Sequence, residues 1–206
     1  MFINLLRKKS YVLATISFLL LTGCGGSSIT GSADNINDGL MAVAGANNSY
    51  TEITDQEKAL LKSINDARAV GRDCNDGQGF RNATYPLYWN TDLYASALEH
   101  STDLALSNTF SHSGSGTASD ITGNGSRSLF YQRIVANGYN NYYSVGENIA
   151  GGQRTIEEVT AAWLASPGHC ANIMSDRYTE VGVAIVTNTN STYGIYWTQN
   201  FGSKRQ

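Results

Sequence analysis

The segment from Trp163 to Met174 gathers the residue types best suited to chemistry, because it holds one of three histidines, one of three cysteines and one of two prolines. Pro167 cannot donate to a helix ladder, but it fits the first position of a helix. We therefore expect one helix to end near Ser166 and a short second helix to begin there. His169 would lie in the first turn of that helix, with Asn172 one turn later on the same side. A neutral imidazole can bind a divalent cation, so this break between helices is a candidate wall of a binding pocket.

The helix that leads into this break is predicted by its cap and its periodicity. Thr155 and Glu158 form a capping-box pattern, in which a hydroxyl cap is followed three residues later by a carboxylate. Ile156, Val159 and Trp163 then fall on one helix face. That face should pack against the core and fix the direction in which the short helix leaves.

The remaining helices and strands predict the fold class. Caps and apolar periodicity predict helices from Thr54 with a stop at Gly71, from Asn90 for about 17 residues, and from Ser126 to Asn137. Strands are expected at 145–149, 180–187 and 193–200, the last two as a hairpin. Residues 180–187 are apolar or small on both faces, so this strand should be covered on both sides. Early helices and late strands predict an α+β fold with a sheet between two helical layers.

Several of these segments carry a family resemblance. Residues 166–174 read Ser-Pro-Gly-His-Cys-Ala-Asn-Ile-Met, which is similar to the signature of bacterial CAP-superfamily domains (cysteine-rich secretory, antigen 5, pathogenesis-related 1; also called SCP domains). Four further motifs follow the family's order: Phe110–Ser113, Gly146–Ala150, Glu180–Ala184 and Tyr196–Gly202. The resemblance implies a three-layer α-β-α sandwich with a central, mainly antiparallel sheet for residues 54–206.

The resemblance also implies a site. Members of the family carry two histidines and two glutamates in a central cavity, and some bind zinc or a similar divalent cation there. The matching residues are His112, Glu147, His169 and Glu180, and Asn172 is expected to line the same cavity. In eukaryotic members the second histidine lies on a late strand, where this chain has Tyr-Trp-Thr-Gln at 196–199. The alternative is a buried polar network that holds no metal. His100 is expected to be a structural residue, as are Asn65 and Arg68, which resemble a helical Asn-x-x-Arg motif of the family.

The N-terminal segment resembles a bacterial lipoprotein signal. Arg7–Lys9 is a basic run, Tyr11–Leu21 is apolar but too short to span a bilayer, and Leu21–Cys24 resembles a lipobox. We predict a signal peptide at 1–23, lipidation of Cys24 and a flexible tether at 24–53. Gly25 after the cysteine resembles an outer-membrane address. The alternative is an ordinary cleaved signal with an incidental cysteine.

Two cysteines remain once Cys24 is assigned to the lipid. In an oxidising compartment Cys74 and Cys170 should pair as a disulfide. The alternative makes Cys170 a nucleophile, but adjacent helix residues point apart, so His169 is a poor base for that thiol.

The net charge and the absence of two hydrolase motifs narrow the classes of function that the sequence supports. The net charge is −3, and removing the three basic residues of 1–23 leaves −6, which disfavours a nucleic-acid partner. The chain has no His-Glu-x-x-His and no Gly-x-Ser-x-Gly motif. We expect an envelope protein that is held at the membrane by its lipid and binds a small hydrophobic or envelope-polymer ligand without catalysis. The alternatives are a metal-dependent hydrolase of peptide or ester bonds and an adhesive or structural surface protein.

Overall fold

The structure, a computed structural model, describes residues 53–205. Its helices are α2 (Asp55–Arg68), α3 (Thr91–Ser107), α4 (Phe130–Ala136), α5 (Ile156–Ala165) and α6 (Pro167–Ile173). Its strands are β1 (Arg72–Asp73), β2 (Phe80–Arg81), β3 (Tyr88–Trp89), β4 (Tyr142–Gly151), β5 (Glu180–Thr187) and β6 (Ile195–Lys204). The predicted signal peptide, the lipidated Cys24 and all of the predicted tether except Ile53 lie outside the described residues. Within residues 53–205, none of the helices has the length and apolar character needed to cross a bilayer.

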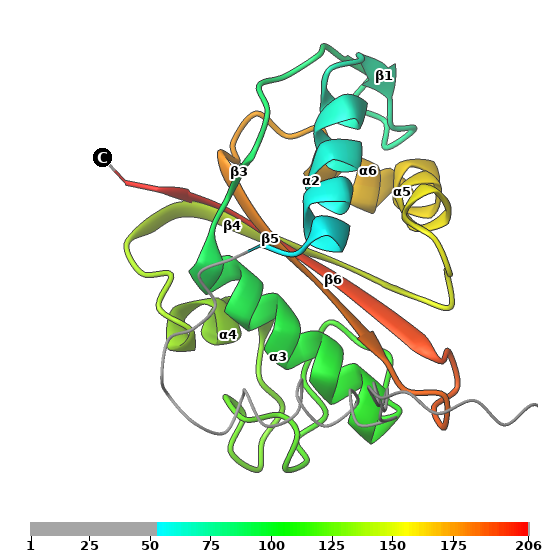
Figure 1. The fold of residues 1–206 in the computed structure, drawn as a ribbon. Helices are drawn as coiled ribbons and strands as arrows, with labels where there is room; N and C mark the ends of the chain where they lie inside the picture. The colour runs from blue at the N-terminus through cyan, green and yellow to red at the C-terminus, as the bar shows by residue number, and fades with distance from the viewer. Residues whose placement is uncertain (1–52, 206) are drawn as a thin grey trace, which may run out of the picture.

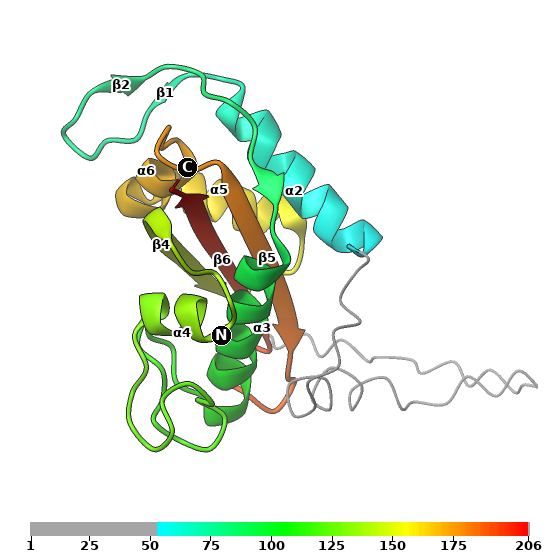
Figure 2. The same cartoon turned by 90° about the vertical axis from the view of Figure 1, so that its left-hand side faces the viewer.

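A four-stranded sheet in the order β3-β5-β6-β4 forms the middle layer. β6 pairs antiparallel with both β5 and β4, whereas the short β3 runs parallel to β5. Helices α2, α5 and α6 cover one face, and α3 and α4 cover the other (Figures 1 and 2). β1 and β2 form a separate two-stranded ribbon. The predicted α+β class, the three layers and the mainly antiparallel sheet are all confirmed.

The larger part of the core lies between the sheet and helices α2, α5 and α6. Its buried side chains include Leu60, Ile64, Val159, Trp163, Val183, Trp197 and Phe201. Ile156 packs against this cluster from the helix surface, so the predicted apolar face of α5 is the buried one. β5 is apolar on both faces because it is covered on both sides.

The N-terminal caps predicted at Thr54 and Asn90 are formed, whereas only the hydroxyl half of the capping box predicted at Thr155 is formed, because the Glu158 carboxylate accepts from the Arg154 amide instead. The Thr54 hydroxyl accepts from the Glu57 amide at 3.2 Å, and the Glu57 carboxylate accepts from the Thr54 amide at 2.8 Å. The Asn90 side chain accepts from the amides of Asp92 and Leu93 at 3.0 and 3.1 Å. These bonds satisfy amides that lack a partner in the first turn, so each helix begins where the sequence predicted.

The end of α2 differs from the prediction. The helix stops at Arg68 rather than running to Gly71. A Cβ at Gly71 would lie 2.8 Å from the Phe80 ring and 2.9 Å from the Arg81 carbonyl oxygen. Glycine is therefore required here by the close approach of β2, and not as a helix stop.

α4 is shorter than predicted. It begins at Phe130 rather than near Ser126, because the Ser128 amide and hydroxyl both donate to Asp120 and hold this part of the chain outside the helix. Its end agrees with the prediction, since Gly138 follows with a φ of +101°. Such a backbone conformation favours glycine.

β4 is longer than the predicted strand at 145–149, and β6 begins at Ile195 rather than 193 and ends at Lys204 rather than 200. The two strands pair from Tyr142 opposite Lys204 to Gly151 opposite Tyr196. This pairing is a long-range contact, and the polar residues near the ends of β4 give no local signal for it.

The other edge of β4 bears three side-chain donors. The carbonyl oxygens of Val145, Glu147 and Ile149 point away from β6. They accept, respectively, from the Tyr178 hydroxyl at 3.4 Å, the Asn172 amide at 3.2 Å and the Trp163 indole at 3.2 Å. Along an edge strand, every second residue points its carbonyl oxygen away from the sheet. Here three successive outward carbonyls accept from side chains, and no neighbouring strand is needed to satisfy them.

The break between α5 and α6 is formed as predicted, with Pro167 in the first turn and Ser166 as the cap. Cys170 of α6 is disulfide-bonded to Cys74, 96 residues earlier, with their Cα atoms 5.5 Å apart. This confirms the predicted disulfide and excludes the alternative in which Cys170 is a nucleophile. The bridge ties α6 to the chain that follows β1.

Candidate functional site

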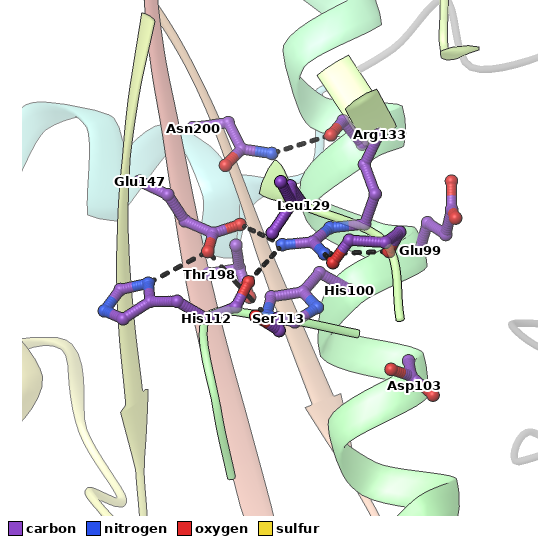
Figure 3. A network of polar contacts seen from close by, with 12 residues as sticks. Glu99, His100, Asp103, His112, Ser113, Leu129, Arg133, Glu147, Thr198 and Asn200 are labelled. Carbon is purple, nitrogen blue, oxygen red and sulfur yellow. Dashed lines mark hydrogen bonds and ion pairs between the residues drawn. The ribbon is translucent and has the colours of Figure 1, made fainter. Parts of the chain in front are cut away.

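Glu147 on β4 is the centre of a buried polar network under α3 and α4 (Figure 3). Its side chain is 1 % exposed. The carboxylate accepts from His112 Nδ1 at 3.0 Å and from Arg133 Nη2 at 2.8 Å. Although burial alone would raise it, the hydrogen bond from His112 and the Arg133 cation together hold the pKa of Glu147 below its usual value. Glu147 is therefore an ionised acceptor that fixes the ring of His112.

Arg133 of α4 ties the network to the chain around His112. Its guanidinium also donates to the His112 carbonyl oxygen at 3.0 Å and to Ser128 Oγ at 3.0 Å. The side chain is 1 % exposed, so the Arg133–Glu147 pair is a buried ion pair. The motifs of the sequence did not indicate Arg133, and no local signal marks it, because a single arginine in a short helix normally faces water.

Asn200 of β6 completes the network and was also missed. It lies directly opposite Glu147 in the β4–β6 register. In the amide orientation that satisfies both of its ends, its nitrogen donates to Glu147 Oε2 at 3.2 Å and its oxygen accepts from Ser96 Oγ at 2.9 Å.

The loop that follows His112 is fixed by two carboxylates, both on side chains that are buried. Asp103 of α3 accepts from the Ser115 amide at 2.8 Å, and Asp120 accepts from the Ser128 amide at 2.9 Å. Burial opposes ionisation of Asp120, but the bonds from Ser128 and from backbone amides outweigh it and lower the pKa. The Gly- and Ser-rich composition of this loop therefore serves a hydrogen-bonded structure around the site.

His100 has the structural role expected for it. Its ring is fully buried, and Nε2 lies 3.0 Å from the Ser111 carbonyl oxygen. A carbonyl oxygen only accepts, so Nε2 carries the proton. Burial lowers the pKa of His100, which keeps the ring neutral and places it against the chain just before His112.

His112 and His169 approach each other around the edge strand β4 from opposite faces of the sheet. Their ring centroids are 6.3 Å apart. Successive side chains of a strand point to opposite faces, so Glu147 reaches the loop of His112 while Asn148 reaches α6. Asn148 donates to the His169 carbonyl oxygen at 3.2 Å. Two neighbouring residues of one strand therefore hold the two histidines.

The exposure of the two rings makes them available to a ligand. The His112 side chain is 52 % exposed, while its Nδ1 is occupied by Glu147. Burial, and then the neighbouring His112, lower the pKa of His169, so that its ring is neutral at neutral pH. The two tilted rings thus lie with their centroids 6.3 Å apart, and the His112 ring is open to solvent.

Asn172 joins the two sides, in agreement with its predicted place beside His169. Its amide donates to the Glu147 carbonyl oxygen at 3.2 Å and to Asn148 Oδ1 at 2.8 Å. It also lines a neighbouring groove beside the end of α6.

The structure does not bring Glu180 to this group. Its carboxylate accepts from Asn90 Nδ2 at 2.9 Å and from the Tyr139 hydroxyl at 2.6 Å. Glu180 lies on β5, opposite Gly202, whereas Glu147 lies on the other side of β6, opposite Asn200. The two glutamates are thus separated by a strand and by two positions in the register. Burial, and then the bond to Glu180, raise the pKa of Tyr139.

The geometry fits a cation only in part. A carboxylate on the second nitrogen of a histidine is a common arrangement around metal ions, and the Glu147–His112 pair provides it. Within residues 53–205, however, no group of three or more His, Cys, Asp or Glu side chains is placed to hold one ion. His112 and His169 would supply two imidazoles, and water or a ligand would complete the coordination.

These features define a disulfide-bonded helix–sheet–helix sandwich with a histidine pair at the edge of its sheet. The chain belongs to the CAP (cysteine-rich secretory protein) family, whose sequence profile matches residues 61–201. The resemblance seen in the motifs is confirmed.

Relatives support the family at different levels. The chain is 46 % identical over 63 residues to the uncharacterized protein YkwD of Bacillus subtilis, which is 31 % of this chain and only 23 % of that protein. An outer surface protein of Borrelia burgdorferi has the same fold, with a TM-score of 0.55 and 21 % identity over 75 % of this chain and 96 % of the other. An extracellular SCP-domain protein of Bacillus anthracis gives 0.51 and 23 %, over 74 % of this chain and 45 % of the other. The identities of 21 % and 23 % to these two solved structures are low, so the structural matches establish the fold alone.

Proposed function

We propose that this CAP-domain protein is held at the cell envelope by a lipid on Cys24 and binds its ligand at the His112–His169 pair, with a divalent cation such as zinc as part of that site. The observation that carries the proposal is the state of His112. Its Nδ1 is held by a buried carboxylate, its ring is half exposed, and the neutral ring of His169 faces it at 6.3 Å. An imidazole oriented in this way is prepared to bind through Nε2.

Binding is favoured over hydrolysis by the environment of Glu147. A general base needs a carboxylate within reach of the reacting water. Glu147 is buried, ionised and bonded to His112 and Arg133, so it orients His112 and has no free face toward a substrate.

The proposed location has three supports. A disulfide between Cys74 and Cys170 fits an oxidising compartment outside the cytoplasm. Two proteins of the same fold are an outer surface protein and an extracellular protein. The basic, apolar, Leu-Thr-Gly-Cys order of residues 7–24 is typical of a lipoprotein signal. Replacing Cys24 with Ser should release the protein from the membrane fraction, and unchanged fractionation would contradict the lipid anchor.

The cation site is tested by calorimetric titration of the purified protein with zinc at pH 7.5. His112→Ala and His169→Ala should each abolish saturable binding. Glu147→Gln should weaken binding by about 10–100-fold, the usual effect of losing an outer-shell partner. Glu180→Gln is the matched control and should leave the affinity unchanged, because Glu180 lies apart from the pair. No saturable uptake by the folded wild type would exclude the cation.

A further inference from the structure

A groove of about 720 Å³ lies beside the end of α6, and neither His112 nor His169 is among its lining residues. One wall is formed by residues 78–85, which include β2 and the chain that leads to β3. The other wall is formed by residues 171–178, which include the end of α6 and the turn before β5. The two walls are about ninety residues apart in the sequence, and nothing in the histidine site uses them apart from Asn172.

A buried arginine clamps the two walls together. The Arg68 side chain donates from Nε to the Tyr85 carbonyl oxygen at 2.8 Å on the first wall. It donates from Nη1 to the carbonyl oxygens of Ile173 and Ser175 at 2.5 and 2.8 Å on the second. Arg68 is 1 % exposed, and burial lowers its pKa to about 10, so it remains a cation at neutral pH.

The disulfide adds a covalent link between the same two regions, since Cys74 precedes the first wall and Cys170 precedes the second. The groove is therefore rigid before a ligand arrives. A preformed groove loses little conformational entropy on binding, which is the condition for a specific site.

The lining has the chemistry of a sugar-binding surface. Gln78 and Asn82 offer side-chain amides that both donate and accept hydrogen bonds, and Arg177 and Asp176 add a charged donor and a charged acceptor. Asn172 offers only its oxygen, because its nitrogen is bonded to Glu147 and Asn148. The ring of Tyr85 is exposed, at 87 %, and its flat face can pack against the apolar face of a pyranose. An apolar ligand would leave these polar groups buried without partners, which is unfavourable.

One further feature narrows the class of sugar. Ala83 and Ala171 are small apolar residues among the amides and hydroxyls of the lining. An acetamido group has the matching parts, because it needs an amide partner for its N–H and C=O and an apolar contact for its methyl.

We propose that this groove binds an oligosaccharide that carries N-acetylamino groups. The ligand lies along the groove, stacks on Tyr85 and hydrogen-bonds to the side-chain amides. The site is separate from the proposed cation site, because neither His112 nor His169 lines the groove, and the proposal stands or fails without metal binding.

The test is calorimetric titration of the full chain in detergent, in the presence of a chelator, with a β-1,4-linked N-acetylglucosamine tetramer. Saturable binding is expected. A β-1,4-linked glucose tetramer, which has the same linkage but no acetamido groups, should bind more weakly by about tenfold, a loss equal to one good polar contact. An acetylated tetra-alanine peptide should not bind, and tighter binding of the peptide than of the sugars would overturn the proposal.

Two exposed lining residues locate the site without disturbing the fold. Tyr85→Ala and Asn82→Ala should each weaken binding of the N-acetylglucosamine tetramer by about tenfold. Tyr143→Ala is the matched control, since that tyrosine is 74 % exposed on β4 and lies outside the groove. His112→Ala should also bind the tetramer normally. Equal affinity of the Tyr85→Ala variant and the wild type, or absence of saturable binding, would overturn the proposal.

The source of the sugar is distinguished by co-sedimentation with two insoluble polymers, purified bacterial cell wall and chitin. Both carry N-acetylated sugars, but only the wall carries peptide side chains. Equal retention on both, reduced by Tyr85→Ala, indicates recognition of the sugar chain alone. Retention on the wall that is unaffected by Tyr85→Ala would overturn the assignment of the groove.

Discussion

The two histidines of the candidate site are held by different means. His112 is fixed by hydrogen-bonded side chains that carry buried charges, Glu147 and Arg133. His169 is fixed through its main chain, by a short helix that a proline begins and a disulfide ties down. Within residues 53–205 no side chain hydrogen-bonds to its ring. One side of the site thus depends on charge balance and the other on covalent geometry, although adjacent residues of β4 serve both.

The largest loss of stability should follow from removing the buried negative charge that holds His112. Glu147→Gln leaves the Arg133 cation buried without a counter-charge, and breaking a buried pair in this way typically costs about 3–5 kcal/mol. We expect a fall of that size in the free energy of unfolding, measured by urea denaturation. Lys62→Ala is the control, because its ion pair with Asp66 is exposed and should contribute at most about 0.5 kcal/mol. Similar effects for the two variants would show that the network is not a buried charge pair.

Removing the covalent support of the His169 side should have the next largest effect. Cys74→Ser should lower the free energy of unfolding by about 2–5 kcal/mol, the usual loss for a native disulfide in a small secreted domain. The Cys170 thiol should then react with an alkylating agent under mild denaturation. The two cysteines of the wild-type domain should stay unreactive without a reductant, and ready alkylation there would contradict the bridge.

A smaller effect is expected where the two sides meet. Asn172→Ala leaves the buried Asn148 Oδ1 without that donor, and such a loss costs about 1–3 kcal/mol. Thermal unfolding would measure the loss. Asn140→Ala, at an exposed turn, should change stability by no more than about 0.5 kcal/mol. An effect of Asn172→Ala no larger than this control would mean that the two sides are held independently.

The smallest effect should appear in the way the free energy of unfolding depends on pH. Burial lowers the pKa of His100 in the folded state below the ordinary value of about 6.5 that it has when unfolded. Below pH 6.5 the unfolded chain therefore binds a proton that the folded chain does not, so stability falls as the pH falls. Above pH 6.5 this contribution is constant. The slope is limited to about 1.4 kcal/mol per pH unit for one proton.

The window from pH 6.5 to 5 separates this contribution from that of Glu147, which titrates at lower pH. His100→Gln should flatten the dependence of the unfolding free energy on pH in that window. His169→Gln should flatten it further, since the pKa of His169 is lowered as well. A slope unchanged by both substitutions would show that neither ring is buried in its neutral form.

Local chemistry made much of this predictable. The caps at Thr54 and Asn90 and the break at Pro167 are determined by residues within a few positions of one another, and they were correctly predicted. The disulfide needed only two cysteines and an oxidising compartment.

What could not be predicted depends on strand register and distant packing. The motifs name Glu147 and Glu180 but carry no information about the residues that stand opposite them in the sheet. Only the pairing of β6 with both strands shows that they stand opposite different residues, Asn200 and Gly202, so that Glu180 is kept from the histidines. Arg133 was missed for a related reason: its partner Glu147 lies on β4, and only the packing of α4 against the sheet brings the two side chains together.

The side-chain donors along β4 have a consequence for how the molecule behaves among its neighbours. A bare strand at the border of a sheet offers its amides and carbonyls to any other chain and so seeds aggregation. Here Tyr178, Asn172 and Trp163 already occupy the outward carbonyls of Val145, Glu147 and Ile149. A second molecule approaching this border finds those acceptors taken and side chains in its way. Even in a crowded solution, a strand of a second molecule should not pair with β4 and extend the sheet.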